Sequence, residues 1–207
     1  NLKIIKELEK IKINYTLVNN LKNLREKLKK KYDIFIVAGF PHIFDEELLK
    51  FPKYGSINLH AGPLPKYRGG SPLNWQIINN EKKMGISIIK LNKKIDGGKI
   101  LIKKFFKLKK TSNIKYAHTK ANTLFKQNIF KSIKNLLSKK YIKKKGKENY
   151  YKQRNEKDSE VDLSTMTAKD VVNLARALYP LYKPPFIKKD GNKIFFKKVY
   201  IEKKYLK

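Results

Sequence analysis

The alternation of helix and strand patterns near the N-terminus constrains the fold of this chain most. Residues 2–12 and 20–32 carry apolar side chains at helical spacing, 14–18 have strand character, and 33–39 (DIFIVAG) form a continuous apolar run. This order predicts an α/β fold with a Rossmann-like, doubly wound and mostly parallel sheet. Because Asn1 already falls inside what reads as a crossover helix, we expect the chain to lack a first βα unit.

The same alternation continues toward the C-terminus. Residues 1–138 are expected to form one domain, the lysine-rich stretch 139–150 a basic linker, and 151–207 a short helix-hairpin appendage. Its hairpin should turn at Asp190-Gly191-Asn192, since Asp-Gly pairs suit tight turns. The further expected elements are helices at 45–51 (with Asp45 as N-cap), 72–80, 112–139 and 167–179, and strands at 55–60, 84–91, 99–108 and within 184–201.

Composition narrows the function classes. The formal net charge of +33 favours contact with anions, but the chain has few arginines beside its many lysines, and nucleic-acid sites favour the bidentate arginine fork. Nucleic acid is therefore a disfavoured partner. There is no cysteine, no His-x-His or His-x₃-His pair, and no apolar run long enough for a membrane span, so we expect no metal, no membrane and a cytoplasmic protein.

Polar chemistry is concentrated in the stretch 57–75 (INLHAGPLPKYRGGSPLNW). Asn58 and His60 lie two apart at a predicted strand end, so their side chains project from one face, and ligands of doubly wound folds bind at that end. Asp96 precedes Gly97-Gly98 in a loop that returns to the same edge. For His60 alone a strand-end hydrogen bond, and for Asp96 alone a plain turn, are the alternative interpretations.

An amide, an imidazole and a carboxylate suit direct attack by a substrate amine on a carbonyl. The amide and a protonated imidazole can donate to the developing oxyanion while the carboxylate orients the ring. A Ser-His-Asp hydrolase would need a G-x-S-x-G elbow, which neither Ser56 nor Ser71 has.

The span NLHAGPLPKYRGGSPLNW, followed by GISIIKLNKKIDGGKIL at 85–101, resembles the formyltransferases that use 10-formyltetrahydrofolate. Their signature is N-x-H, LP-x-Y-R-G and P, with a downstream D-x-G. The resemblance implies the formyltransferase fold, that Asn58 and His60 hold the formyl oxygen, and that Asp96 assists proton transfer from the attacking amine. It also implies that six residues clasp the pterin: Phe40, Pro41, Ile43, Phe44, Leu91 and Ile95.

The segment 154–186 resembles the short C-terminal part of sugar N-formyltransferases, although Lys183-Pro184-Pro185 replaces their commoner Pro-Gly-Ala turn. About sixty residues follow the linker, whereas methionyl-tRNA formyltransferases carry a full C-terminal barrel domain. The resemblance thus implies a nucleotide-linked amino sugar as substrate. The residues expected to bind it are Tyr67, Arg68, Gly69, Arg154, Asn173 and Arg176.

Several alternatives stay open. The chain could be a methionyl-tRNA formyltransferase, with tRNA as its partner, or a non-catalytic folate-binding fragment. Arg176 could form a salt bridge within the protein instead of binding a diphosphate. Trp75 and Tyr67 are expected to be mainly structural, with stacking on substrate as the alternative for Tyr67. A homodimer is compatible with the sequence.

Overall fold

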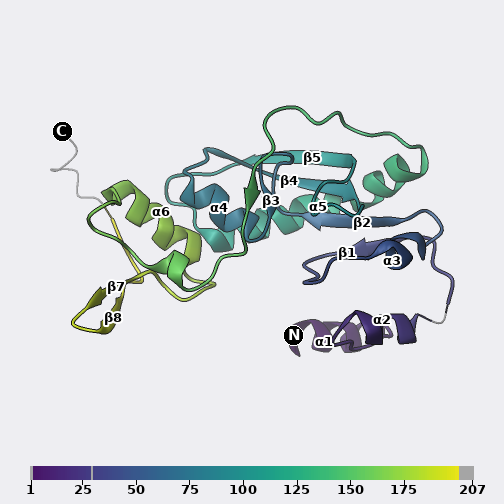
Figure 1. Ribbon diagram of the computed structural model, residues 1–207, viewed down its shortest axis with the longest axis horizontal. Coiled ribbons are helices and arrows are strands. Elements are labelled where there is room, and N and C mark those ends of the chain that lie inside the picture. The colour runs from purple at the N-terminus through teal and green to yellow at the C-terminus, as the bar shows by residue number, and fades with distance from the viewer. Residues whose placement is uncertain (1, 29, 201–207) are drawn as a thin grey trace.

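A four-stranded mixed sheet forms the centre of the computed structural model, which describes residues 2–28 and 30–200 (Figure 1). Its strand order is β1-β2-β4-β5, and only β1 and β2 pair in parallel. The α/β class is confirmed. The sheet was expected to be mostly parallel, but within it the β2–β4 and β4–β5 pairs are antiparallel. The short connection from β4 to β5 permits a hairpin and no crossover. The strands are β1 Phe35–Val37, β2 Ser56–His60, β4 Lys83–Lys90 and β5 Ile100–Lys107.

The long helix α5 (Ile114–Leu137) packs along β4 and β5 and buries the main core between them. Asn113 caps its first turn by accepting a hydrogen bond from the Tyr116 amide at 3.2 Å. The isoleucines of β4 are fully buried, and Ile86 and Ile88 belong to the core shared with this helix. This burial explains the unbroken apolar run of the strand. The core side chains from these three elements include Met84, Ile86, Ile88, Leu101, Ala117, Ala121 and Phe125.

Two helices at the N-terminus, α1 (Leu2–Lys10) and α2 (Leu21–Lys27), lie beyond the β1 edge of the sheet (Figure 1). Arg25 joins this region to α3 (Glu46–Lys50) through an ion pair with Glu47 at 3.2 Å. The expected strand at 14–18 is wrong. Its alternating residues are largely exposed, and none of the described strands pairs with it, so the pattern alone was not enough to form a ladder.

Short helices frame the loops around the sheet as expected. Asp45 caps α3 by accepting from the Leu48 amide at 3.1 Å. Helix α4 (Pro72–Ile78) begins with proline at its first position, where the missing N–H costs nothing. The described residues contain no helix with both the length and the apolar character to cross a membrane.

The C-terminal segment is docked against the rest of the chain. Helix α6 (Ala168–Leu178) starts in a capping box between Thr167 and Asp170 and packs on α4, where the Asn74 amide donates to the Ala177 carbonyl at 2.7 Å. The hairpin follows as expected, and its turn residues Asp190 and Gly191 both have positive φ. Its strands are β7 Phe186–Lys189 and β8 Asn192–Phe195, and a short 3₁₀ helix spans Lys157–Ser159.

The stretch expected to be a linker contacts the sheet along its course. Ile142 pairs with Ile100 in an isolated antiparallel bridge, and the Lys144 ammonium donates to the Gly97 carbonyl at 2.7 Å. The chain then enters β6 (Tyr150–Tyr151), which pairs in parallel with β3 (Arg68–Gly69). The loop after β2 is therefore held from outside by a segment that is distant in sequence. The division into three domain parts stays a prediction.

Candidate active site

Asn58, His60 and Asp96 meet at the end of β2. The Oδ1 atom of Asp96 lies 3.4 Å from the Asn58 amide nitrogen and 3.4 Å from Nδ1 of His60. The His60 and Asp96 side chains are only 6% and 8% exposed. The strand spacing puts the first two residues together, and the β4–β5 loop brings Asp96 to them across 38 positions of sequence. The structure thus assembles the amide, imidazole and carboxylate that the sequence singled out.

Asp96 is held from three directions, which a plain turn residue would not require. Its Oδ2 atom accepts the Gly69 amide at 2.8 Å, while Oδ1 faces Asn58 and His60. Its backbone has φ of 48°, a left-handed conformation that Asp tolerates better than most residues. Gly98 allows the loop to fold this tightly, because a Cβ there would lie 1.7 Å from the Lys90 carbonyl oxygen.

The His60 ring lies between two oxygen acceptors. Nε2 contacts the Tyr67 carbonyl oxygen, and Nδ1 faces the Asp96 carboxylate. Burial lowers the pKa of His60, while the Asp96 charge and the Tyr67 carbonyl act against that shift. Burial prevails, so the net shift of the His60 pKa is downward, which favours the neutral ring; donation by a protonated imidazole during the reaction stays a prediction. A neutral imidazole can still donate through one nitrogen and accept a proton at the other.

The loop after β2 closes tightly around this ring. A Cβ on Gly62 would lie 2.7 Å from His60 Nε2 and 2.7 Å from the Tyr67 carbonyl oxygen, so the site needs glycine there. Arg68 clamps the facing loop through hydrogen bonds from Nε and Nη2 to the Ile95 carbonyl, at 3.0 and 2.7 Å. These contacts connect the two loops that carry His60 and Asp96.

Tyr67 is buried and engaged by contacts within the protein. Its side chain is 1% exposed, its hydroxyl donates to Glu81 at 2.7 Å, and its ring stacks on Tyr151 with centroids 4.9 Å apart. Burial also raises the pKa of the Tyr67 hydroxyl. Trp75 also makes a contact within the protein, because its indole N–H donates to the Lys152 carbonyl at 2.9 Å. Stacking of Tyr67 on a substrate would require this packing to open.

The six residues expected to hold a pterin flank β2 on both sides. Strand β1 ends with Val37 beside Asn58, and β4 ends with Lys90 beside Ile57. Ile43 and Ile95 are 58% and 39% exposed, which leaves apolar surface on the two following segments. Phe40 packs edge to face on the largely buried Phe44, 5.5 Å between centroids, and the Leu91 amide donates to the Ser56 carbonyl at 2.8 Å. Their part in binding, with that of Pro41, stays a prediction.

Three residues expected to bind the substrate are engaged by the protein itself. Arg154 donates to the Asp158 carbonyl at 2.8 Å and the Ser159 hydroxyl at 2.9 Å. Arg176 donates to the carbonyls of Lys109 and Lys110, at 3.1 and 2.7 Å, so its contacts with the described residues are main-chain hydrogen bonds. Asn173 is buried on α6. Within residues 2–28 and 30–200 none of the three is hydrogen-bonded to His60, and their assignment to a diphosphate stays a prediction.

Two buried polar residues that support the site were missed in the sequence. Gln76 is fully buried, donates to the Ala61 carbonyl at 2.9 Å and accepts the Gly85 amide at 2.8 Å. The Ser87 hydroxyl accepts the Leu64 amide at 3.0 Å. Both tie the loop after His60 to the helix and strand behind it. The available signals were a glutamine on the apolar face of a helix and a serine within an apolar strand.

Across residues 2–28 and 30–200, no three His, Cys, Asp or Glu side chains gather as a metal-binding group. The Asp96 carboxylate instead accepts hydrogen bonds from the Asn58 side chain and the Gly69 main chain.

Among curated proteins, the chain is similar to the methionyl-tRNA formyltransferase of Caldanaerobacter subterraneus subsp. tengcongensis, with 36% identity over 130 residues, 63% of this chain and 42% of that protein. It is also similar to the bifunctional polymyxin resistance protein ArnA of Wigglesworthia glossinidia brevipalpis, with 36% identity over 164 residues, 78% of this chain and 25% of that protein. The chain therefore spans less than half the length of these two relatives.

Solved structures share the fold. A 4-N formyltransferase from Francisella tularensis superposes with a TM-score of 0.74 at 25% identity, over 97% of this chain and 83% of its own. A methionyl-tRNA formyltransferase from Clostridium thermocellum gives 0.68 at 22% identity, over 97% and 87%. WlaRD, a sugar 3N-formyl transferase whose structure was obtained in the presence of dTDP and 5-N-formyl-THF, gives 0.62 at 22%, over 78% and 59%. The expected formyltransferase fold is thereby confirmed.

The family model described as Formyl transferase matches residues 8–133, which include Asn58, His60 and Asp96. Together with the shared fold, this match shows that the chain belongs to the formyl transferase family.

Proposed function

We propose that this protein transfers a formyl group from 10-formyltetrahydrofolate to the primary amine of a nucleotide-linked amino sugar. The observation that carries the proposal is the buried cluster of Asn58, His60 and Asp96 at the end of β2, inside the segment that matches the family. The folate is a co-substrate that supplies the formyl carbon. The exposed apolar side chains of Ile43 and Ile95 on the two flanking segments suit contact with its flat ring system.

The cluster can supply the two functions that amine formylation requires, hydrogen bonds to the developing oxyanion and a base for the amine proton. Asn58 can donate its amide N–H to the formyl oxygen as negative charge develops there, and the His60 N–H can add a second donor. Asp96 and the neutral His60 ring can accept the proton that the amine loses as its new C–N bond forms. That proton then passes to the folate nitrogen, as the bond between this nitrogen and the formyl carbon breaks. The products are a formamide and tetrahydrofolate, and no covalent enzyme intermediate is needed.

The sugar substrate is supported by the structural neighbours. The 4-N formyltransferase and the methionyl-tRNA formyltransferase each superpose on 97% of this chain, and the former has the higher TM-score, 0.74 against 0.68. A sugar 3N-formyl transferase shares the fold as well. Under this proposal the C-terminal segment borders the sugar nucleotide, and residues such as Arg68 and Arg154 would have to exchange protein contacts for substrate contacts.

A methionyl-tRNA substrate is the second candidate. The curated methionyl-tRNA formyltransferase is 36% identical over 130 residues, and the net charge of +33 suits a polyanionic partner. A non-catalytic folate-binding protein is the third. The interlocked contacts of Asp96 argue against it, because they maintain a geometry that binding alone would not need.

One assay separates these candidates. The chain is incubated with 10-formyltetrahydrofolate and, in parallel, with nucleotide-linked 4-amino sugars, 3-amino sugars and methionyl-tRNA, and formamide formation is read by mass spectrometry. Product from an amino sugar in a reaction that His60→Ala abolishes supports the proposal. Product from methionyl-tRNA alone would establish the second candidate. Folate binding without product from any amine would support the third candidate, a non-catalytic folate-binding protein.

A further inference from the structure

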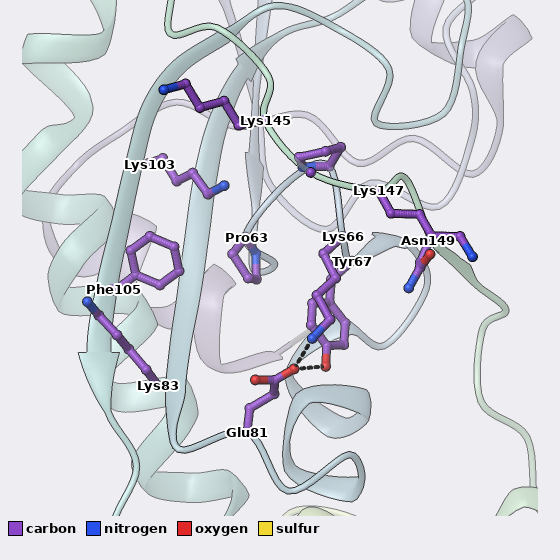
Figure 2. Close-up of a pocket in the computed structure, with 12 residues that line it drawn as sticks. Pro63, Lys66, Tyr67, Glu81, Lys83, Lys103, Phe105, Lys145, Lys147 and Asn149 are labelled. Carbon is purple, nitrogen blue, oxygen red and sulfur yellow. Dashed lines mark hydrogen bonds and ion pairs between the residues drawn. The ribbon is translucent and has the colours of Figure 1, made fainter.

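A segment distant in sequence, residues 142–152, runs past both loops of the candidate active site, and we call it the strap. Asn149 of the strap exchanges two main-chain hydrogen bonds with the loop after β2. Its amide donates to the Pro65 carbonyl at 3.3 Å, and its carbonyl accepts the Arg68 amide at 3.0 Å. Figure 2 shows Asn149 beside this loop, next to Tyr67. The strap is therefore fixed against the loop that closes on the imidazole.

The turn that carries Asp96 is held at both of its ends by cations. Before Asp96, the Ile95 carbonyl accepts hydrogen bonds from Nε and Nη2 of Arg68, at 3.0 and 2.7 Å. After it, the Gly97 carbonyl accepts one from the Lys144 ammonium of the strap, at 2.7 Å. Hydrogen bonds from charged donors are shorter and stronger than those between neutral groups. The main chain on each side of Asp96 thus has a charged anchor.

One carboxylate of the strap joins these two cations. Oε2 of Glu148 accepts a hydrogen bond from Nη1 of Arg68 at 2.7 Å, and Oε1 lies 3.7 Å from Nζ of Lys144. A half-exposed ion pair adds little to overall stability, and the Glu148 side chain is 50% exposed. Glu148 instead limits where the two cations can lie, so that their other donors are directed at the turn.

Asp96 needs such support for two reasons. Its φ of 48° is a left-handed conformation, which costs free energy in a residue other than glycine and persists only when its surroundings hold it. Its Oδ1 atom also lies 3.4 Å from both the Asn58 amide nitrogen and Nδ1 of His60, which is near the long limit for a hydrogen bond. A small outward shift of the turn would therefore break both contacts.

We propose that Lys144 and Glu148 are positioning residues for the reaction, which act through the main chain of the turn to keep Asp96 in contact with Asn58 and His60. Both lie outside the three-residue cluster. Their effect on catalysis rests on the proposed function, in which Asp96 orients His60 and accepts the amine proton. The placement of the turn does not rest on it, and this placement can be measured without any substrate.

Amide hydrogen exchange at Gly69 reports the placement directly, because this amide donates to Oδ2 of Asp96 at 2.8 Å. We expect Lys144→Met to accelerate exchange of the Gly69 amide about fivefold or more, since the anchor on the Gly97 carbonyl is lost. Lys144→Arg keeps a charged donor and should stay within about twofold of the parent. Glu148→Gln should accelerate the exchange about threefold or more, because both cations lose their shared carboxylate.

Two controls account for general charge effects and for a loss of global stability. Lys143→Met removes the same charge from the neighbouring, exposed position of the strap, and should leave exchange at Gly69 within about twofold of the parent. The Gly85 amide donates to the side chain of the buried Gln76 at 2.8 Å. It should exchange at the parent rate in every variant.

Formamide formation provides the catalytic readout. Lys144→Met should lower kcat about fivefold or more and leave KM within about twofold of the parent, because proton transfer suffers while the contacts with the substrate stay. Lys144→Arg should recover most of the lost kcat. If the parent forms no product from any amine, the proposed function fails, and exchange at Gly69 alone then decides whether Lys144 and Glu148 hold the turn.

Three results would overturn the proposal. The Gly69 amide could exchange equally fast in Lys144→Met and Lys143→Met, which would mean that the strap does not hold the turn. The Gly85 amide could be accelerated as much as that of Gly69, which would mean a general loss of stability. Lys144→Met could raise KM with kcat unchanged, which would make Lys144 a substrate-binding residue.

Discussion

Nδ1 of His60 lies 3.4 Å from Oδ1 of Asp96, and both side chains are nearly inaccessible to solvent. The same carboxylate reaches the Asn58 amide and the Gly69 main chain. One acidic residue therefore contacts both residues that we propose to face the formyl carbonyl, and it also anchors the loop that carries Gly69. We expect the loss of each member to change the site in a distinct way.

Removing either oxyanion donor should slow the reaction with little effect on folding. We expect His60→Ala and Asn58→Ala each to lower turnover by about 10²-fold or more, with a modest change in KM, because the lost hydrogen bond strengthens only as charge develops. Steady-state kinetics with the amine substrate give both values. A His60→Ala enzyme with near-normal turnover would remove the imidazole from the mechanism.

Stability should fall with acid below about pH 6.5. Burial lowers the pKa of His60 and also that of His118, so the folded protein resists protons that the unfolded chain accepts. The free energy of unfolding should then decrease by up to about 1.4 kcal/mol per pH unit for each group as pH falls through this window. Urea unfolding between about pH 5 and pH 8 measures it.

The variant His60→Gln isolates one of these two contributions. It should flatten the acid dependence of the free energy of unfolding, while His118→Gln removes only the separate contribution of the partly buried His118. An unchanged slope in His60→Gln would show that the buried imidazole titrates normally.

Gln76 should matter for stability although it touches no reacting group. Gln76→Leu leaves the Ala61 carbonyl and the Gly85 amide without their partner, and we expect a loss of about 2–4 kcal/mol in the free energy of unfolding. Gln127→Leu, an exposed change on α5, should stay within about 0.5 kcal/mol of the parent. Equal effects of the two substitutions in urea titrations would contradict the supporting role.

Trp75→Phe should lower the melting temperature more than it lowers activity. The substitution removes the hydrogen bond to the Lys152 carbonyl and part of the packing on Tyr151, at a cost of about 1–2 kcal/mol. Turnover should remain within about threefold of the parent. Normal melting with lost activity would instead put Trp75 in contact with the substrate.

The spacing of apolar residues correctly predicted the helices and strands that bury one face. The helices α5 and α6, the apolar strand β4 and the turn at Asp190-Gly191 all follow from local pattern. The stretch 14–18 has strand-like alternation but no described neighbour to pair with, so a local pattern could not decide its structure. The antiparallel pairing of β2 with β4 likewise depends on tertiary packing.

The sequence predicted the three polar residues of the cluster, but it did not predict the buried residues that hold the surrounding loop in place. Asn58 and His60 share a face by strand spacing alone, and the glycines after Asp96 indicated a tight return loop. The contacts of Gln76 and Ser87 depend on which strand lies behind the loop, and spacing does not encode that. The downward shift of the His60 pKa depends on burial by the whole loop, which strand spacing does not encode.

The most direct test of the catalytic proposal is formamide formation by Asp96→Asn, measured beside the parent protein together with thermal unfolding of both. Asparagine keeps the size of the side chain and tolerates positive φ, so folding should survive. It removes the charge that orients His60 and accepts the amine proton, so formyl transfer should fall by about two orders of magnitude or more. Activity within about threefold of the parent, with normal melting, would show that Asp96 is only a turn residue and would refute the three-residue mechanism.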